Sequence, residues 1–213
     1  MTLIARFQFL THDSPKMTHA QQAEMVCSAG GRWIQLRTKG KDYNEWRRVA
    51  CEVQEVCRSF GATFILNDNV RIAKEIGADG VHLGKLDMSI PEARRMLGDE
   101  FLVGGTANTA DDLLQLDRFG VDYIGLGPFR QTQTKQNLSP VLGSGGIQRT
   151  VSRHRASSLI PVVAIGGIGI EDLPELFTTG VYGVALSSYI LGHDEPHEAV
   201  RQFVETVMEW EAE

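Results

Sequence analysis

The sequence predicts an α/β protein, and within that class a single (β/α)8 TIM barrel. Short apolar runs recur along the chain, and stretches with helical periodicity lie between them. The runs are apolar throughout instead of alternating with polar residues, which is typical of parallel strands covered on both faces. Eight strand–helix units within 213 residues match the size of one such barrel. We therefore expect a single domain over residues 1–213.

Glycine marks where several of the strands begin. The run FGVDYIGLG from Phe119 follows the periodic stretch Asp111–Phe119, whose leucines favour one side. A helix ends readily on glycine because glycine tolerates the left-handed conformation, and the chain then enters a strand. Glycine also introduces GGRWIQLR from Gly30, FGATFILND from Phe60, GADGVHLG from Gly77 and TGVYGVALSS from Thr179. In chain order, the expected strands are Phe7–Thr11, Trp33–Leu36, Thr63–Leu66, Gly80–Leu83, Leu102–Gly105, Tyr123–Gly127, Val162–Ile165 and Gly183–Leu186.

A helical segment can follow each strand, and the weakest is the short one near Ser89–Met96, where Pro91 suits a first turn. The alternative architecture is an open, doubly wound sheet. We favour the closed barrel because no GxGxxG fingerprint opens the first unit and because polar clusters follow many different strands.

Composition limits the partners and the compartment. The formal net charge is −6 with acids and bases interspersed, which argues against a nucleic-acid binder. Cys27, Cys51 and Cys57 lack framework spacing, which favours free thiols in a reducing compartment. The N-terminus has no signal-peptide pattern, and no apolar run approaches the ~20 residues needed to cross a membrane. We expect a cytoplasmic protein without a membrane partner, and the sequence leaves a homo-oligomer open.

Cations and carboxylates follow the strands at the end where this fold carries its active site. Arg37, Lys39 and Lys135 supply positive charge suited to phosphate oxygens. Asp68 and Asp87 add hard oxygen ligands, and the combination favours Mg²⁺ bridging to a diphosphate. The alternative is that these residues form ordinary surface ion pairs.

Small residues follow the last two strands. Gly166, Gly167, Ser187 and Ser188 occupy the usual phosphate site of this fold, although the glycines could simply permit a tight turn. His82 lies within an apolar strand, which favours a hydrogen-bonded barrel histidine over a catalytic base, and the role of His12 stays open. No Ser/His/Asp or Cys/His arrangement points to covalent catalysis.

As a set, the motifs resemble those of the thiamine phosphate synthase family, also called thiamine-phosphate pyrophosphorylase. The resemblance covers essentially the whole chain in order. The motifs that carry it are Gln35-Leu-Arg37-Thr-Lys39, Asn67-Asp68, Gly80-Val-His-Leu-Gly84 with Asp87, Gly125-Leu-Gly-Pro128 with Thr132-Gln-Thr134-Lys135, and Ala164-Ile-Gly-Gly-Ile168.

This resemblance implies an Mg²⁺-dependent transferase with two small-molecule substrates. The family joins 4-amino-5-hydroxymethyl-2-methylpyrimidine diphosphate to 4-methyl-5-(2-hydroxyethyl)thiazole phosphate, and releases thiamine phosphate and pyrophosphate. The residues that the resemblance assigns are Gln35, Arg37, Lys39 and Lys135 for the pyrimidine diphosphate, Asn67 and Thr106 near the pyrimidine, Asp68 and Asp87 for Mg²⁺, and Thr132, Thr134, Gly167, Ser187 and Ser188 for the thiazole phosphate. Among these, Lys135, Arg37 and Lys39 would be catalytic.

Several positions depart from the family pattern. Thr38 stands where an acidic residue is usual, Thr106 replaces a serine, and Ser187 replaces an apolar residue. The segment Pro128-Phe-Arg-Gln-Thr132 also differs, and Arg130 adds a cation close to the site. Three rivals are a thiazole tautomerase on the same scaffold, a non-catalytic barrel that binds thiamine precursors, and another phosphate-binding barrel such as a sugar-phosphate epimerase. Retention of Asp68, Asp87 and Lys135 speaks against the tautomerase.

Overall fold

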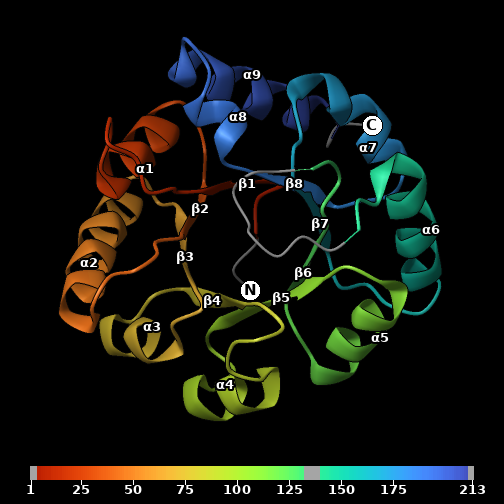
Figure 1. The fold of residues 1–213 in the computed structure, drawn as a ribbon, viewed down its shortest axis with the longest axis horizontal. Helices are drawn as coiled ribbons and strands as arrows, with labels where there is room; N and C mark the ends of the chain where they lie inside the picture. The colour runs from red at the N-terminus through yellow and green to blue at the C-terminus, as the bar shows by residue number, and fades with distance from the viewer. Residues whose placement is uncertain (1–3, 132–139, 211–213) are drawn as a thin grey trace.

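The computed structural model describes residues 4–131 and 140–210, which form a closed barrel of eight parallel strands. Each strand pairs with the next in chain order, and β8 returns to pair with β1. Figure 1 shows the helices as an outer ring around the strands. The predicted (β/α)8 barrel is confirmed, and the alternative of an open sheet is wrong because the two edge strands of such a sheet are hydrogen-bonded to each other here.

All eight predicted strands are present, with ends that differ from expectation by at most two residues. The largest difference is in β5, which continues through Thr106 to Ala107 because Thr106 and Ala107 pair with the strand that follows. The strands are β1 (Phe7–Leu10), β2 (Trp33–Leu36), β3 (Thr63–Asn67), β4 (Gly80–Leu83), β5 (Leu102–Ala107), β6 (Tyr123–Leu126), β7 (Val162–Ile165) and β8 (Gly183–Leu186).

A helix follows every strand, as expected. Helices α3 and α5 end at Gly77 and Gly120, whose positive φ angles of 63° and 69° explain why glycine is needed there. The helices are α1 (His19–Ser28), α2 (Tyr43–Ser59), α3 (Val70–Ile76), α4 (Ile90–Leu97), α5 (Ala110–Phe119), α6 (Gly143–Arg155), the 3₁₀ turn η1 (Ile170–Asp172), α7 (Leu173–Thr178), α8 (Ser188–Leu191) and α9 (Pro196–Glu209). Within the described ranges, none of these helices combines the length and the apolar character that crossing a membrane requires.

The strands separate two apolar cores. The larger core lies between the sheet and the helices and includes Ile34 and Leu36. The smaller core fills the barrel itself and includes Trp33, Ile65 and Tyr123. Because successive side chains of a strand point to opposite faces, Gln35 faces the barrel interior, as Trp33 does.

The barrel interior changes from apolar to polar toward the carboxyl ends of the strands. Tyr123 is fully buried, and its hydroxyl lies 3.4 Å from Gln8 Nε2 and 3.2 Å from His82 Nδ1. Burial raises the pKa of Tyr123, so the phenol stays neutral and can donate. His82 Nε2 in turn lies 2.9 Å from Thr106 Oγ1. His82 is therefore hydrogen-bonded through both ring nitrogens, as a barrel histidine should be.

Glycines make room for these large interior side chains. A Cβ atom at Gly104 would lie 2.2 Å from Tyr123 Cζ on the neighbouring strand. At Gly125 it would lie 3.1 Å from His82 Cε1. The positions of Tyr123 and His82 thus depend on the absence of side chains at Gly104 and Gly125.

Replacing Gly104 by alanine should lower the free energy of unfolding by about 1–3 kcal/mol, as overpacked cores usually do. The new methyl group would overlap the buried Tyr123 ring, which cannot move without displacing its own partners. Gly145→Ala is the matched control, because its Cβ would meet only the flexible end of Arg149, at 3.4 Å. Gly145 lies in α6, where alanine is favoured over glycine by up to about 1 kcal/mol. Urea unfolding of both variants checks this, and equal stabilities would contradict it.

Candidate active site

The structure places the described site residues at the carboxyl ends of different strands. Gln35 lies in β2 with Arg37 and Lys39 just beyond it. Asn67 ends β3, and Thr106 lies near the end of β5. The remaining described residues, Asp68, Asp87, Gly167, Ser187 and Ser188, follow β3, β4, β7 and β8. Because all eight strands are parallel, these positions share one end of the barrel. Thr132, Thr134 and Lys135 lie outside the described residues.

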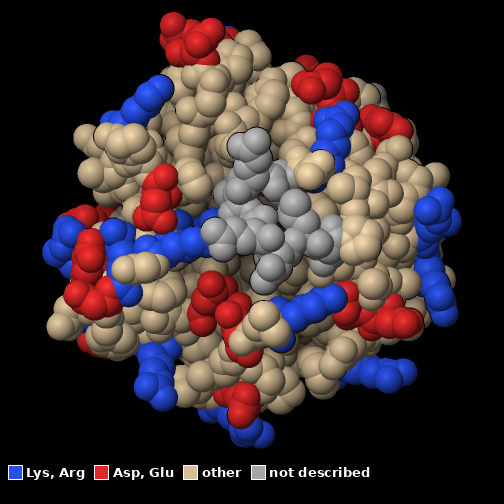
Figure 2. Space-filling view, viewed as in Figure 1, with Lys and Arg blue, Asp and Glu red and all other residues tan. Residues whose placement is uncertain are grey.

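Figure 2 shows one face of the molecule along the view of Figure 1, with Lys and Arg side chains interspersed with Asp and Glu around it. No broad band of one sign crosses this face in the described residues. On this face, an anion would therefore be attracted by local groups of side chains and backbone donors.

Gln35 is buried, and its two polar ends have different surroundings. Its Nε2 atom donates to Gln8 Oε1 over 3.3 Å. Its Oε1 atom is buried and has no partner among the residues that the structure describes. A buried amide oxygen without a partner is costly, so it is suited to accept a hydrogen bond from a ligand.

The residues after β3 take an uncommon backbone conformation. Asp68 has φ 65°, the only positive value for a non-glycine residue in the described ranges. Its backbone N–H donates to the His82 carbonyl over 2.9 Å, and Asn67 is in register with His82. Asp is one of the few residues besides glycine that adopt this conformation readily, and such residues occur often at functional sites.

Asp87 is held by the loop that carries it. One carboxylate oxygen, Oδ2, accepts from the Gly84 backbone N–H over 2.6 Å. Asp68 and Asp87 thus follow two strands that are direct neighbours in the barrel.

The metal ligands expected from the sequence are two carboxylates at the ends of neighbouring strands. The described residues contain no group of three or more His, Cys, Asp or Glu side chains that could enclose an ion. Mg²⁺ usually binds through one or two carboxylates, with waters and substrate phosphates completing its shell. Asp68 and Asp87 could supply those carboxylates.

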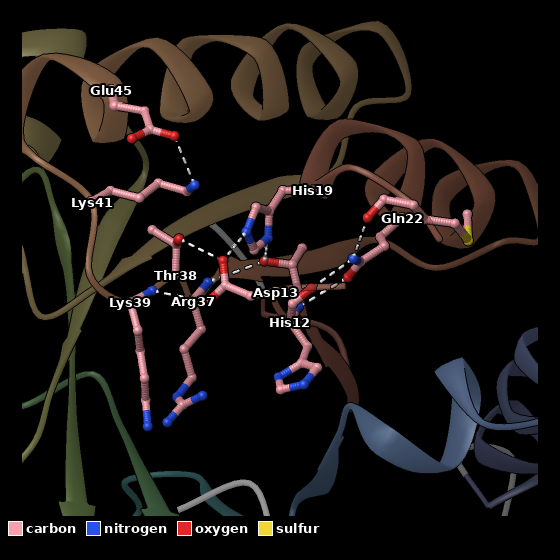
Figure 3. A network of polar contacts seen from close by, with 11 residues as sticks. His12, Asp13, His19, Gln22, Arg37, Thr38, Lys39, Lys41 and Glu45 are labelled. Atoms are coloured by element: carbon pink, nitrogen blue, oxygen red, sulfur yellow. Dashed lines mark hydrogen bonds and ion pairs between the residues drawn. The ribbon is translucent and has the colours of Figure 1, made fainter. Parts of the chain in front are cut away.

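The segment Arg37–Lys39 is held from behind by the loop after β1 (Figure 3). Asp13 accepts from the Thr38 hydroxyl over 2.9 Å and from the Lys39 backbone N–H over 3.0 Å. Figure 3 shows the side chains of Arg37 and Lys39 extending in the same direction, away from His19. Two cations on one side of a fixed segment suit a ligand with several phosphate oxygens.

Hydrogen bonds keep Asp13 ionised. Partial burial acts to raise the pKa of Asp13, but hydrogen bonds from His19, Thr38 and the Lys39 N–H outweigh it, so the pKa lies below its ordinary value. Burial lowers the pKa of His19, and the nearby Asp13 offsets only part of this effect. An ionised Asp13 beside a neutral His19 follows.

Gly166 and Gly167 have positive φ angles and lie so close to the loop after β6 that a side chain would not fit. Their φ angles are 103° and 66°. A Cβ atom at Gly166 would lie 2.9 Å from Pro128 Cα, and one at Gly167 would lie 2.9 Å from Arg130 Cβ. The two loops therefore touch, so the glycines do more than permit a turn.

Arg130 joins these loops instead of adding an unpaired cation to the site. Its backbone N–H donates to the Gly166 carbonyl over 2.8 Å. Its guanidinium makes a two-pronged ion pair with the buried Asp172, with N–O distances of 2.5 Å. Asp172 Oδ2 also accepts from the Gly169 N–H over 2.8 Å. The positive charge that the sequence places near the site is thus largely neutralised by Asp172.

Ser187 and Ser188 lie where β8 passes into α8. The hydroxyl oxygen of Ser187 is buried and has no partner within residues 4–131 and 140–210. Ser188 is exposed. Both hydroxyls sit at the strand end next to the Gly166–Gly167 loop, since β7 and β8 are neighbours.

The sequence interpretation missed the residues that hold the site in place. Thr11, Asp13 and His19 support the Arg37–Lys39 segment, and Asp172 supports the glycine loop. Their position just after a strand could have identified Thr11 and Asp13. His19 begins a helix eight residues after Thr11 and carries no motif that marks it, and the ion-pair partner of Asp172 lies 42 residues away in the chain.

Two grooves elsewhere in the described residues do not include any predicted site residue. One, of about 490 Å³, lies between the loop after β1 and α2 and is lined by residues that include Asp13 and Lys41. The other, of about 330 Å³, is lined by residues that include Gln54 and Asp79. Neither adds a predicted ligand to the site at the strand ends.

Comparison with known proteins gives the family. A family model described as thiamine monophosphate synthase matches residues 7–190. A thiamine-phosphate synthase of Phocaeicola vulgatus is 47% identical over 190 residues, which cover 89% of this chain and 91% of the relative. A thiamine-phosphate synthase of Bacteroides thetaiotaomicron is 46% identical over 198 residues, covering 92% and 95%.

A solved structure agrees with these relatives. The thiamine phosphate pyrophosphorylase of Pyrococcus furiosus superposes with a TM-score of 0.85 at 28% identity and covers 96% of each chain. The family expected from the motifs, and with it a thiamine-phosphate synthase function, are confirmed, whereas the dependence on Mg²⁺ stays a prediction. The chain belongs to the thiamine monophosphate synthase family.

Proposed function

We propose that the chain forms thiamine phosphate and pyrophosphate from the pyrimidine diphosphate and the thiazole phosphate, with Mg²⁺ bound by Asp68 and Asp87. The observation that carries this proposal is the placement of Arg37 and Lys39 after β2, with the two aspartates after the next two strands. Cations and metal-binding carboxylates at one end of a barrel suit a substrate that leaves as a polyanion.

The pyrimidine diphosphate would lie across the ends of β2 to β5. Arg37 and Lys39 would bind the diphosphate oxygens, while Gln35 and Asn67 would contact the pyrimidine side. Thr106 has its hydroxyl 2.9 Å from His82 Nε2, so its orientation is set by the barrel interior. Mg²⁺, when bound, would neutralise the diphosphate and lower the cost of its departure.

The reaction needs stabilisation of a leaving group more than it needs a base. The pyrimidine methylene C–O bond breaks, and its electron pair leaves with pyrophosphate. The amino group of the pyrimidine helps to stabilise the resulting cation, and the thiazole nitrogen then attacks that carbon to form the new C–N bond. Fixed cations and aligned substrates accelerate such a step without covalent catalysis.

The thiazole phosphate would bind at the ends of β7 and β8. Gly167 allows its backbone to approach an anion, and the buried Ser187 hydroxyl would gain a partner there. The resemblance adds Ser188, Thr132 and Thr134 to this group and places Lys135 near the departing diphosphate. The tautomerase and sensor alternatives differ in that neither releases pyrophosphate.

Incubation of the protein with both substrates and Mg²⁺ should produce thiamine phosphate and pyrophosphate in equal amounts. Each turnover makes one new C–N bond and releases one leaving group, so the amounts must match. Chromatography measures the first product and a coupled phosphate assay measures the second. Absence of both products at high protein concentration would contradict the proposal.

Replacing Asp87 by asparagine should raise the Mg²⁺ concentration needed for half-maximal activity by roughly 10-fold or more, as loss of a metal ligand or its support often does. The amide oxygen can still accept from the Gly84 N–H, so the loop is kept while the charge is lost. Asp79→Asn is the matched control, because Asp79 also accepts from a backbone N–H, that of Phe64, but precedes β4 at the opposite end of the barrel. Identical Mg²⁺ titrations for both variants would remove Asp87 from the metal site.

Replacing Lys135 by alanine should lower kcat by about 100-fold, the usual scale for loss of one group that stabilises developing negative charge. The effect should fall on turnover because the charge on the leaving group grows as the C–O bond breaks. Lys74→Ala is the control, since Lys74 donates to the Met96 carbonyl on the outer surface. Steady-state kinetics at saturating substrates measure the change, and an unaltered kcat would exclude Lys135 from the leaving-group site.

A further inference from the structure

The loop after β1 holds the Arg37–Lys39 segment at three points, two on its backbone and one on the Thr38 side chain. The Arg37 N–H donates to Thr11 Oγ1 over 3.1 Å. The Thr38 hydroxyl and the Lys39 N–H donate to the two carboxylate oxygens of Asp13, over 2.9 and 3.0 Å. These contacts fix the backbone on both sides of Thr38, and they leave the charged ends of Arg37 and Lys39 to extend elsewhere (Figure 3).

His19 completes this arrangement from the start of α1. It is buried, with Nδ1 2.7 Å from Thr11 Oγ1 and Nε2 3.1 Å from Asp13 Oδ1. The proton positions follow from the partners. Thr11 accepts from the Arg37 N–H, so its own hydroxyl can donate to His19 Nδ1. His19 Nε2 then carries the proton and donates to Asp13. With this assignment, the hydrogen bonds from Arg37 to Thr11, from Thr11 to His19 and from His19 to Asp13 each have one donor and one acceptor.

Helix α1 gives the loop a rigid support. Gln22 Oε1 accepts from the His12 N–H over 2.9 Å, and its Nε2 donates to the His12 and Met17 carbonyls over 2.7 and 3.1 Å. Thr18 and Gln21 form a reciprocal cap at the first turn of the helix. Asp13 and Thr11 are therefore fixed to a helix and not to a free loop.

We propose that Thr11, Asp13 and His19 are positioning residues that set the direction in which Arg37 and Lys39 meet the diphosphate. The inference rests on the proposed function, because it assumes that this segment binds a diphosphate. None of the three residues needs to touch the substrate. Sites held by a second set of hydrogen-bonded residues keep the narrow geometry that catalysis requires, and a displacement of about 1 Å can cost up to 100-fold in rate.

A pair of threonine variants isolates the hydroxyl of Thr11. Thr11→Val keeps the shape of the buried side chain but removes the acceptor for the Arg37 N–H, whereas Thr11→Ser keeps it. Thr11→Val should raise KM for the pyrimidine diphosphate about 10-fold and leave KM for the thiazole phosphate within about 2-fold. Thr11→Ser should restore both values to nearly those of the unaltered protein.

Thr179→Val is the matched control for loss of a buried threonine hydroxyl. Thr179 is buried and donates to the Leu176 carbonyl over 2.6 Å, between α7 and β8 at the opposite end of the barrel. It should lose thermal stability without a change in either KM. Asp13→Asn is a second variant that loosens the same segment. The Asp13 side chain is partly exposed, so asparagine should fit there. The single amide oxygen of asparagine could accept from only one of the two donors, the Thr38 hydroxyl or the Lys39 N–H.

Binding of inorganic pyrophosphate with Mg²⁺, measured by calorimetry, separates this inference from the proposed function. If the unaltered protein binds pyrophosphate but forms no thiamine phosphate, the proposed function fails. A weaker pyrophosphate affinity in Thr11→Val and Asp13→Asn, with Thr179→Val unchanged, supports the positioning role. Unchanged affinity and KM in both variants, or equal increases in the KM of both substrates, would overturn it.

Discussion

Pairing of β8 with β1 closes the sheet, and the arrangement of the whole molecule depends on that closure. Every strand is parallel to its two neighbours, so all the carboxyl ends meet at one mouth. Residues far apart in the chain, such as Arg37 and Ser187, thereby reach the same end of the barrel. In the closed sheet, successive side chains of each strand point alternately outward and inward. The outward set packs against the helices, and the inward set fills the barrel.

The side chains that point into the barrel connect its apolar base to the candidate site. Trp33 and Tyr123 pack edge to face, with ring centroids 4.8 Å apart, and fill the space below the polar layer. The Tyr123 hydroxyl begins a series of contacts through His82 to Thr106. The series holds only because Gly104 leaves room for the phenol ring. Thr106, which we propose lies near the substrate, is therefore oriented by packing deep inside the barrel.

At the mouth of the barrel, some loops carry the charged side chains and others hold those loops in place by hydrogen bonds. Arg37 and Lys39 carry the charge, while their backbone is held by residues of the preceding strand–helix unit. On the other side, Arg130 ties the loop after β6 to the loop after β7 by its ion pair with Asp172. A cation near the proposed phosphate site is thus not always a ligand, because here the ion pair of Arg130 with a buried carboxylate joins two loops.

The sequence by itself determined the fold class, the eight strands and the strand-end residues, because strand burial and glycine-ended helices are local patterns that appear along the chain. Asp68 and Asp87 could be placed at the mouth for the same reason. Only the tertiary structure decided which residues support them. The contact of Arg37 with Thr11, 26 residues apart, and the pairing of Arg130 with Asp172, 42 residues apart, join different strand–helix units. Such contacts depend on the three-dimensional distance between loops, and no periodicity of the sequence records that distance.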